Sequence, residues 1–202
     1  MGPIDESRDL LAWTTQVISR ARAHGPIEDA SLELKATWPE PKRAARQLAG
    51  QANASSEKLV RWLIGVGEDG EVRGAPRIEL STWWAQVRAH FDGQAPTLSE
   101  RVVQSPGTLP VMVLEFKVGN KPYIFKPQTR GTDREVPWRE GTGTRSATKQ
   151  ELASLFVQRI ELPKAFLLNA VLTATKSQHE VHWILPRGSL RRGRPFNRVG
   201  DS

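Results

Sequence analysis

The 202-residue sequence contains no cysteine, a single tyrosine and only four histidines. Without cysteine, the chain can form no disulfide framework, no cysteine-ligated zinc or iron–sulfur site and no thiol nucleophile. A reducing compartment, the cytoplasm, is therefore the expected location. At this length a folded chain buries on the order of 70% of the surface that its unfolded form exposes, so we expect one globular domain that is stable without cross-links.

Long apolar runs are also missing from the sequence. No stretch reaches the roughly 18 consecutive apolar residues that a membrane-spanning helix needs. The first ten residues carry acids where a signal peptide carries bases. We therefore expect a protein that is not exported and has no membrane partner.

The scarce histidines argue against a histidine-based metal site. His179 and His182 lie three residues apart, whereas the zinc-protease pattern needs two histidines four apart on one helix face. On a strand, these two side chains point to opposite faces of the sheet. A ligand role for this pair is not expected.

The net charge of +7 is distributed unevenly along the chain. Residues 1–100 carry 12 basic and 14 acidic side chains, whereas residues 101–202 carry 17 basic and 8 acidic ones. Clustered Lys and Arg side chains gain affinity for phosphates from the counterions that they displace. The second half therefore predicts a polyanionic partner such as RNA or DNA; a basic surface without such a partner is the alternative.

Hydrophobic periodicity predicts a mixture of helices and strands. The predicted helices cover residues 5–23, 41–55, 79–91 and 148–159. The predicted strands cover residues 31–38, 59–66 and a short segment near 72. Two hairpins are also predicted, one at 111–126 with Gly119-Asn120 as its turn and one at 166–185. This order predicts the α+β class, with a mixed or antiparallel sheet and packed helices.

The segment 31–38 alternates polar and apolar residues and predicts a strand with one solvated face. Ser31, Glu33, Lys35 and Thr37 form that solvated face. Glu33 and Lys35 then lie side by side, about 7 Å apart along the strand.

Residues 65–70 match the G-x-G-x-x-G pattern of dinucleotide-binding loops. That pattern requires a helix directly after the glycines, because the helix N-terminus binds the pyrophosphate. Here Gly74 and Pro76 follow, and no helical periodicity is present. We therefore interpret the segment as a turn between two strands.

Clustered carboxylates are the strongest chemical signal in the sequence. Glu28 and Glu33 surround the start of the strand at 31–38, and Glu68 and Asp69 follow the next predicted strand. Carboxylates that converge can hold a hard divalent cation, and a nearby lysine such as Lys35 can stabilise the charge that develops on an attacked phosphodiester. A solvated strand face with a Glu–Lys pair is the alternative.

Several short segments together resemble the Schlafen AlbA-like domain. The first segment is Glu28 to Lys35, which ends in Leu-Glu-Leu-Lys. The second is the small-residue helix that ends with Ala52-Asn53. The third is Trp62 to Val66 and the acidic turn after it. Residues 136–147, Val-Pro-Trp-Arg-Glu-Gly-Thr-Gly-Thr-Arg-Ser-Ala, are similar to the closing arginine–glycine segment of that family. The similarity spans residues 25–160.

The resemblance implies an α+β nucleic-acid-binding domain that is often dimeric. It divides the chain into an N-terminal helix at 1–24, the AlbA-like domain at 25–160, a C-terminal β-hairpin extension at 161–187 and a basic tail at 188–202. Some members of the family are metal-dependent endoribonucleases that cut transfer RNA with three acidic residues.

By the same resemblance, the expected catalytic residues are Glu28, Glu33, Lys35 and Glu68. Three carboxylates would hold Mn²⁺ or Mg²⁺, with Asp69 as the substitute for Glu68. Glu28 and Glu33 differ by an odd number of positions, so they cannot share a face of one strand. We therefore expect Glu28 to reach the site from the preceding loop.

Basic residues in three places are expected to contact nucleic acid. They are Lys42, Arg43 and Arg46 at the start of the helix at 41–55; Lys126, Arg130, Arg139 and Arg145 before and within the arginine–glycine loop; and Arg191 and Arg192 in the tail. Glycines between Arg139 and Arg145 favour a loop whose backbone amides bind an anion.

Taken together, the sequence predicts a nucleic-acid-binding protein and, in its sharper form, a divalent-metal-dependent endoribonuclease acting on structured RNA such as tRNA. Two alternatives stay open. One is a non-catalytic DNA- or RNA-binding module, such as a regulator, and the other is an interaction subunit of an antiviral defence assembly. A homodimer is the expected oligomeric state.

Overall fold

The structure, a computed structural model, describes residues 3–104 and 107–156. Within these ranges the helices are α1 (Pro3–His24), α2 (Pro41–Ala54), α3 (Leu80–Ala89) and α4 (Lys149–Phe156). The strands are β1 (Leu32–Lys35), β2 (Leu59–Ile64), β3 (Phe91–Asp92), β4 (Thr97–Val103), β5 (Val111–Lys117), β6 (Ile124–Phe125), β7 (Pro137–Glu140) and β8 (Gly143–Ser146). The expected hairpin at 161–187 and the basic tail lie outside the described residues.

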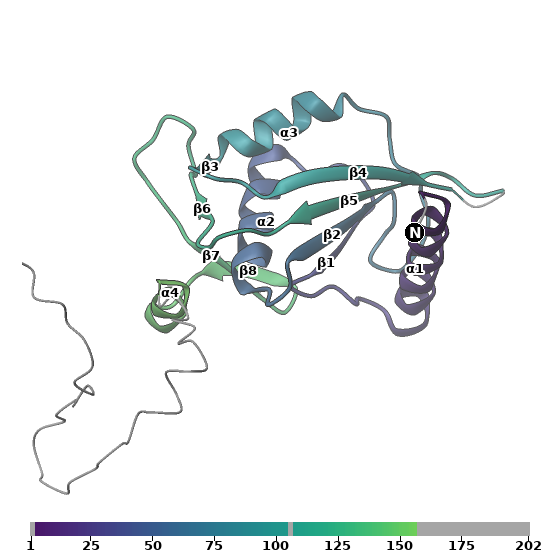
Figure 1. The fold of residues 1–202 in the computed structure, drawn as a ribbon, viewed down its shortest axis with the longest axis horizontal. Helices are drawn as coiled ribbons and strands as arrows, with labels where there is room; N and C mark the ends of the chain where they lie inside the picture. The colour runs from purple at the N-terminus through teal and green to yellow at the C-terminus, as the bar shows by residue number, and fades with distance from the viewer. Residues whose placement is uncertain (1–2, 105–106, 157–202) are drawn as a thin grey trace, which may run out of the picture. The chain divides into compact units, whose positions relative to one another are not determined.

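A mixed four-stranded sheet with the order β1-β2-β5-β4 forms the centre of the fold (Figure 1). β1 and β2 are parallel, with Glu33 opposite Trp62 and Leu34 opposite Leu63. β5 runs antiparallel to both β2 and β4. The predicted α+β class is therefore confirmed.

Helix α2 provides the crossover that two parallel neighbours require. Its small residues, Ala44, Ala45, Ala49 and Ala52, are fully buried and let the helix pack closely on the sheet. Glu40 caps its N-terminus, since the side chain accepts hydrogen bonds from the backbone N–H groups of residues 42 and 43. This carboxylate offsets the unfavourable position of the basic residues in the first turn.

Helix α1 packs on the opposite face of the sheet. Its buried residues Val17 and Ala21 join Leu34, Leu63 and Val66 in a second, smaller core. The same alternation along β1 that turns Leu34 toward α1 turns Glu33 toward α2.

Asn53 connects the end of α2 to two distant segments. Its side-chain nitrogen donates to the carbonyls of Tyr123 and Pro137, and its side-chain oxygen accepts from the N–H of Tyr123. Because Pro137 begins β7, Asn53 helps to hold the β7–β8 hairpin against α2 (Figure 1).

Three sequence predictions about local structure are wrong. Residues 111–126 do not form a hairpin: β5 pairs with β2 and β4, and β6 pairs with β3. The arginine–glycine segment is the β7–β8 hairpin rather than a loop. Glu33 is buried instead of solvated, because α2 covers its side of β1.

Candidate functional site

Glu28, Glu33 and Lys35 meet at the edge strand β1, as the sequence predicts. Glu28 enters from the preceding loop and folds back, so that its Oε1 accepts a hydrogen bond of 3.1 Å from the N–H of Leu34. The ammonium of Lys35 pairs with Oε1 of Glu33 on the same side of the strand. Both carboxylates are buried, with side chains 4% and 1% exposed.

Arg139 of β7 completes this cluster from a segment 111 residues beyond Glu28. Its Nη2 lies 3.0 Å from Oε2 of Glu33 and 3.5 Å from Oε2 of Glu28. The Arg139 side chain is only 2% exposed. The sequence interpretation placed this arginine on a nucleic-acid-binding surface; the structure instead buries it between two carboxylates. We call Glu28, Glu33, Lys35 and Arg139 the acid–guanidinium cluster.

Gln51 supports the cluster from inside helix α2. Its Nε2 donates to Oε2 of Glu33 at 3.1 Å, and its Oε1 accepts from the indole N–H of Trp62 at 2.6 Å. The amide therefore links Glu33 to Trp62, its neighbour across the β1–β2 pair. Sequence reasoning missed this role; a glutamine among the small residues of α2 was the available signal.

Glu68 lies close enough to the cluster to act on it electrostatically. Burial is the main cause that raises the pKa of Glu28, and the negative charges of Glu33 and Glu68 raise it further. Lys35 and the N–H of Leu34 act in the opposite direction. The structure thus brings the predicted acids Glu28, Glu33 and Glu68 into one electrostatic neighbourhood.

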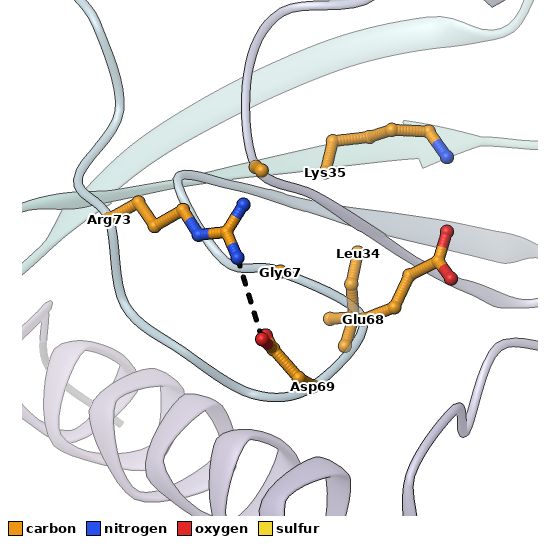
Figure 2. A pocket seen from close by; sticks show the side chains of 7 residues that line it. Leu34, Lys35, Gly67, Glu68, Asp69 and Arg73 are labelled. Atoms are coloured by element: carbon orange, nitrogen blue, oxygen red, sulfur yellow. Dashed lines mark hydrogen bonds and ion pairs between the residues drawn. The ribbon is translucent and has the colours of Figure 1, made fainter.

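A hollow of about 340 Å³ lies beside the end of β1, lined by Lys35, Gly67, Glu68 and Arg73 among others. Figure 2 shows the side chain of Glu68 extending to the same side as the Lys35 ammonium. Asp69, the expected substitute for Glu68, turns instead to Arg73 and forms an ion pair of 3.4 Å with it. Asp69 is therefore the acid that the structure leaves apart from the cluster.

The Gly65–Gly70 segment forms this side of the hollow and is a turn, as interpreted from the sequence. A bridge between Val66 and Val72 closes it, and no helix follows within the described residues up to Leu80. Gly65 has a φ of +94°, and a Cβ there would lie 2.4 Å from the backbone nitrogen of Ala75. This close approach requires glycine.

The carboxylate oxygens of Glu28 and Glu33 are all used by donors of the protein. Glu28 accepts from Leu34 and contacts Arg139; Glu33 binds Lys35, Arg139 and Gln51. In the part of the chain that the structure describes, no three His, Cys, Asp or Glu side chains form a group that could hold a metal ion. In this arrangement the donor set does not fit Mn²⁺ or Mg²⁺.

Two more of the expected phosphate-binding arginines are engaged in ion pairs. Arg46 holds Glu135 through two hydrogen bonds of 2.9 and 2.7 Å. Arg145 binds both Glu140 and Glu151. The cations Lys42, Arg43 and Arg130 are exposed, and Lys126 is half-buried. Arg191 and Arg192 lie outside the described residues.

The chain matches no protein-family model, and a search of curated proteins finds no match. The fold and the cluster therefore define an α+β protein with a buried acid–guanidinium site. Among the helices of residues 3–104 and 107–156, none has the length and apolarity needed to cross a bilayer.

Proposed function

We propose that this chain is a cytoplasmic nucleic-acid-binding protein of the Schlafen AlbA-like type, with structured RNA such as tRNA as its favoured ligand, and that it acts as a homodimer. The observation that most supports this proposal is the contact of Arg139 with Glu28 and Glu33. The two acids and the arginine belong to separate segments that resemble the family. If the similarities were accidental, segments so far apart in the sequence would not be expected to contribute side chains to one cluster.

The phosphate-binding surface in this proposal is formed by Lys42, Arg43, Lys126 and Arg130, which we call the basic surface. The Arg46–Glu135 pair joins helix α2, which carries Lys42 and Arg43, to the segment that follows Lys126. The backbone N–H of Lys126 also donates to the carbonyl of His90, the residue that follows α3. Contacts from these side chains to the phosphate backbone of a nucleic acid give affinity that does not depend on the base sequence.

A metal-dependent endoribonuclease is the second candidate function. The electrostatic effect of Glu68 on Glu28 favours it, and Glu68 lines one hollow together with Lys35. In this form Glu28, Glu33 and Glu68 would hold Mn²⁺ or Mg²⁺, which requires Arg139 to leave the carboxylates. Lys35 would stabilise the charge on the attacked phosphate.

The experiment that tests the proposal uses the full chain with end-labelled tRNA and duplex DNA, in Mn²⁺, Mg²⁺ or EDTA. Binding is measured by fluorescence anisotropy, and cleavage is measured on a denaturing gel. We expect RNA binding that weakens with salt. Discrete cuts that need metal and vanish in Glu33→Gln would establish the nuclease. Weak binding to both nucleic acids would refute the proposal and direct attention to a protein partner.

A further inference from the structure

The acid–guanidinium cluster is balanced in charge without a metal ion. Glu28 and Glu33 contribute two negative charges, and Lys35 and Arg139 contribute two positive ones. Burying a carboxylate is costly unless a cation and hydrogen bonds compensate it. Here the chain itself supplies both, because every carboxylate oxygen of the pair already has a partner.

The hydrogen-bonding capacity that is left in the cluster also disfavours a cation. Among the described residues, Nε of Arg139 is the one buried side-chain nitrogen or oxygen without a hydrogen-bond partner. Nε carries a proton and has no lone pair to offer, so an oxygen atom can satisfy it and a metal ion cannot. The guanidinium position therefore attracts acceptors rather than divalent cations.

We propose that the guanidinium of Arg139 takes the place of a divalent cation between Glu28 and Glu33 and keeps such ions out. The cluster then attaches the β7–β8 hairpin to the sheet, and the chain binds nucleic acid without a metal-dependent cut. This inference rests on the proposed function for identifying the cluster with the acidic site of the Schlafen-type similarity. Removing the guanidinium uncovers a latent site made by two carboxylates, with Glu68 nearby.

The test is a titration of the full chain with Mn²⁺ alone. Binding is measured by calorimetry and by the decrease of the electron paramagnetic resonance signal of free Mn²⁺. Wild type, Arg139→Gln and the double variant Arg139→Gln/Glu28→Gln are compared. We expect no specific Mn²⁺ binding in wild type, one bound ion in Arg139→Gln and its loss in the double variant. Mn²⁺ should also raise the melting temperature of Arg139→Gln and leave that of wild type unchanged.

Two results would overturn the inference. One is an Mn²⁺ ion bound by wild type and lost in Glu28→Gln, and the other is a folded Arg139→Gln that binds none. If Arg139→Gln does not fold, the comparison of wild type with Glu28→Gln decides the question. RNA affinity is measured on the same samples without metal, so a failure of the proposed function is seen separately.

Discussion

The guanidinium of Arg139 and the carboxylate of Glu33 lie 3.0 Å apart, with side chains 2% and 1% exposed. Arg139 belongs to the β7–β8 hairpin and Glu33 to the edge strand β1. One buried ion pair therefore connects the arginine–glycine segment to the sheet. Substituting either Arg139 or Glu33 alone leaves an uncompensated charge in the protein interior.

We expect Arg139→Met to reduce the free energy of unfolding by about 3–5 kcal/mol, because it leaves Glu28 and Glu33 buried beside each other without the guanidinium. Urea unfolding measures this loss. The matched control is Arg73→Met, whose half-exposed ion pairs with Asp69 and Glu71 are worth roughly 0–1 kcal/mol. Equal effects of the two substitutions would show that the buried pair has no special role.

Gln51→Leu should destabilise the protein by about 1–3 kcal/mol, because it removes the partner of a buried indole N–H and one donor to Glu33. Urea unfolding measures the loss of the free energy of unfolding. Gln47→Leu, one turn earlier in α2, is the control, since Gln47 bonds neither Glu33 nor Trp62. A neutral effect of Gln51→Leu would contradict the supporting role of this amide.

Stability in acid should depend on Glu151. Hydrogen bonds first from Arg145 and then from Thr148 lower the pKa of Glu151 from 4.5 to about 2. Because the unfolded chain binds this proton more readily, the stabilising contribution is complete above pH 4.5 and is lost as the pH falls toward 2. Glu151→Gln should therefore flatten the dependence of urea unfolding on pH in that window, and an unchanged slope would contradict the prediction.

Substitution of the basic surface should weaken RNA binding and its salt dependence together. Lys42→Ala/Arg43→Ala removes two exposed cations, and each lost phosphate contact lowers the slope of log affinity against log salt by about 0.7–0.9. Anisotropy at several salt concentrations measures both quantities. The control is Lys58→Ala/Lys117→Ala, which removes two exposed cations from other segments. An identical loss in both pairs would place the binding surface elsewhere.

The strands were predicted unevenly, and the reason is visible in β4 and β5. β5 is rich in apolar residues and was recognised, whereas β4 has mostly exposed side chains and was not. β4 lies at the edge of the sheet with most of its side chains in solvent, so it lacks the apolar alternation by which a half-buried strand is recognised. Its backbone pairing with β5 leaves no mark in the sequence pattern.

Glu33 shows the same limit within the site. The alternation along β1 correctly placed Glu33 and Lys35 on one face, and their ion pair confirms it. It could not show that α2 and Arg139 would cover that face, because burial depends on segments far away in the chain. Gln51 and Asn53 of α2 acquire their roles in the same way, through partners in distant segments of the chain.

The sequence by itself determined the α+β class, the positions of the helices, the turn at Gly65–Gly70 and the placement of Glu33 and Lys35 on one face of β1. Helical and strand periodicities and the spacing of charged residues are local, so they can be read from the chain directly. The tertiary structure alone decided that Arg139 is buried between two carboxylates instead of facing solvent. That outcome depends on a hairpin packing against α2 and β1, and long-range packing selects which charges become partners.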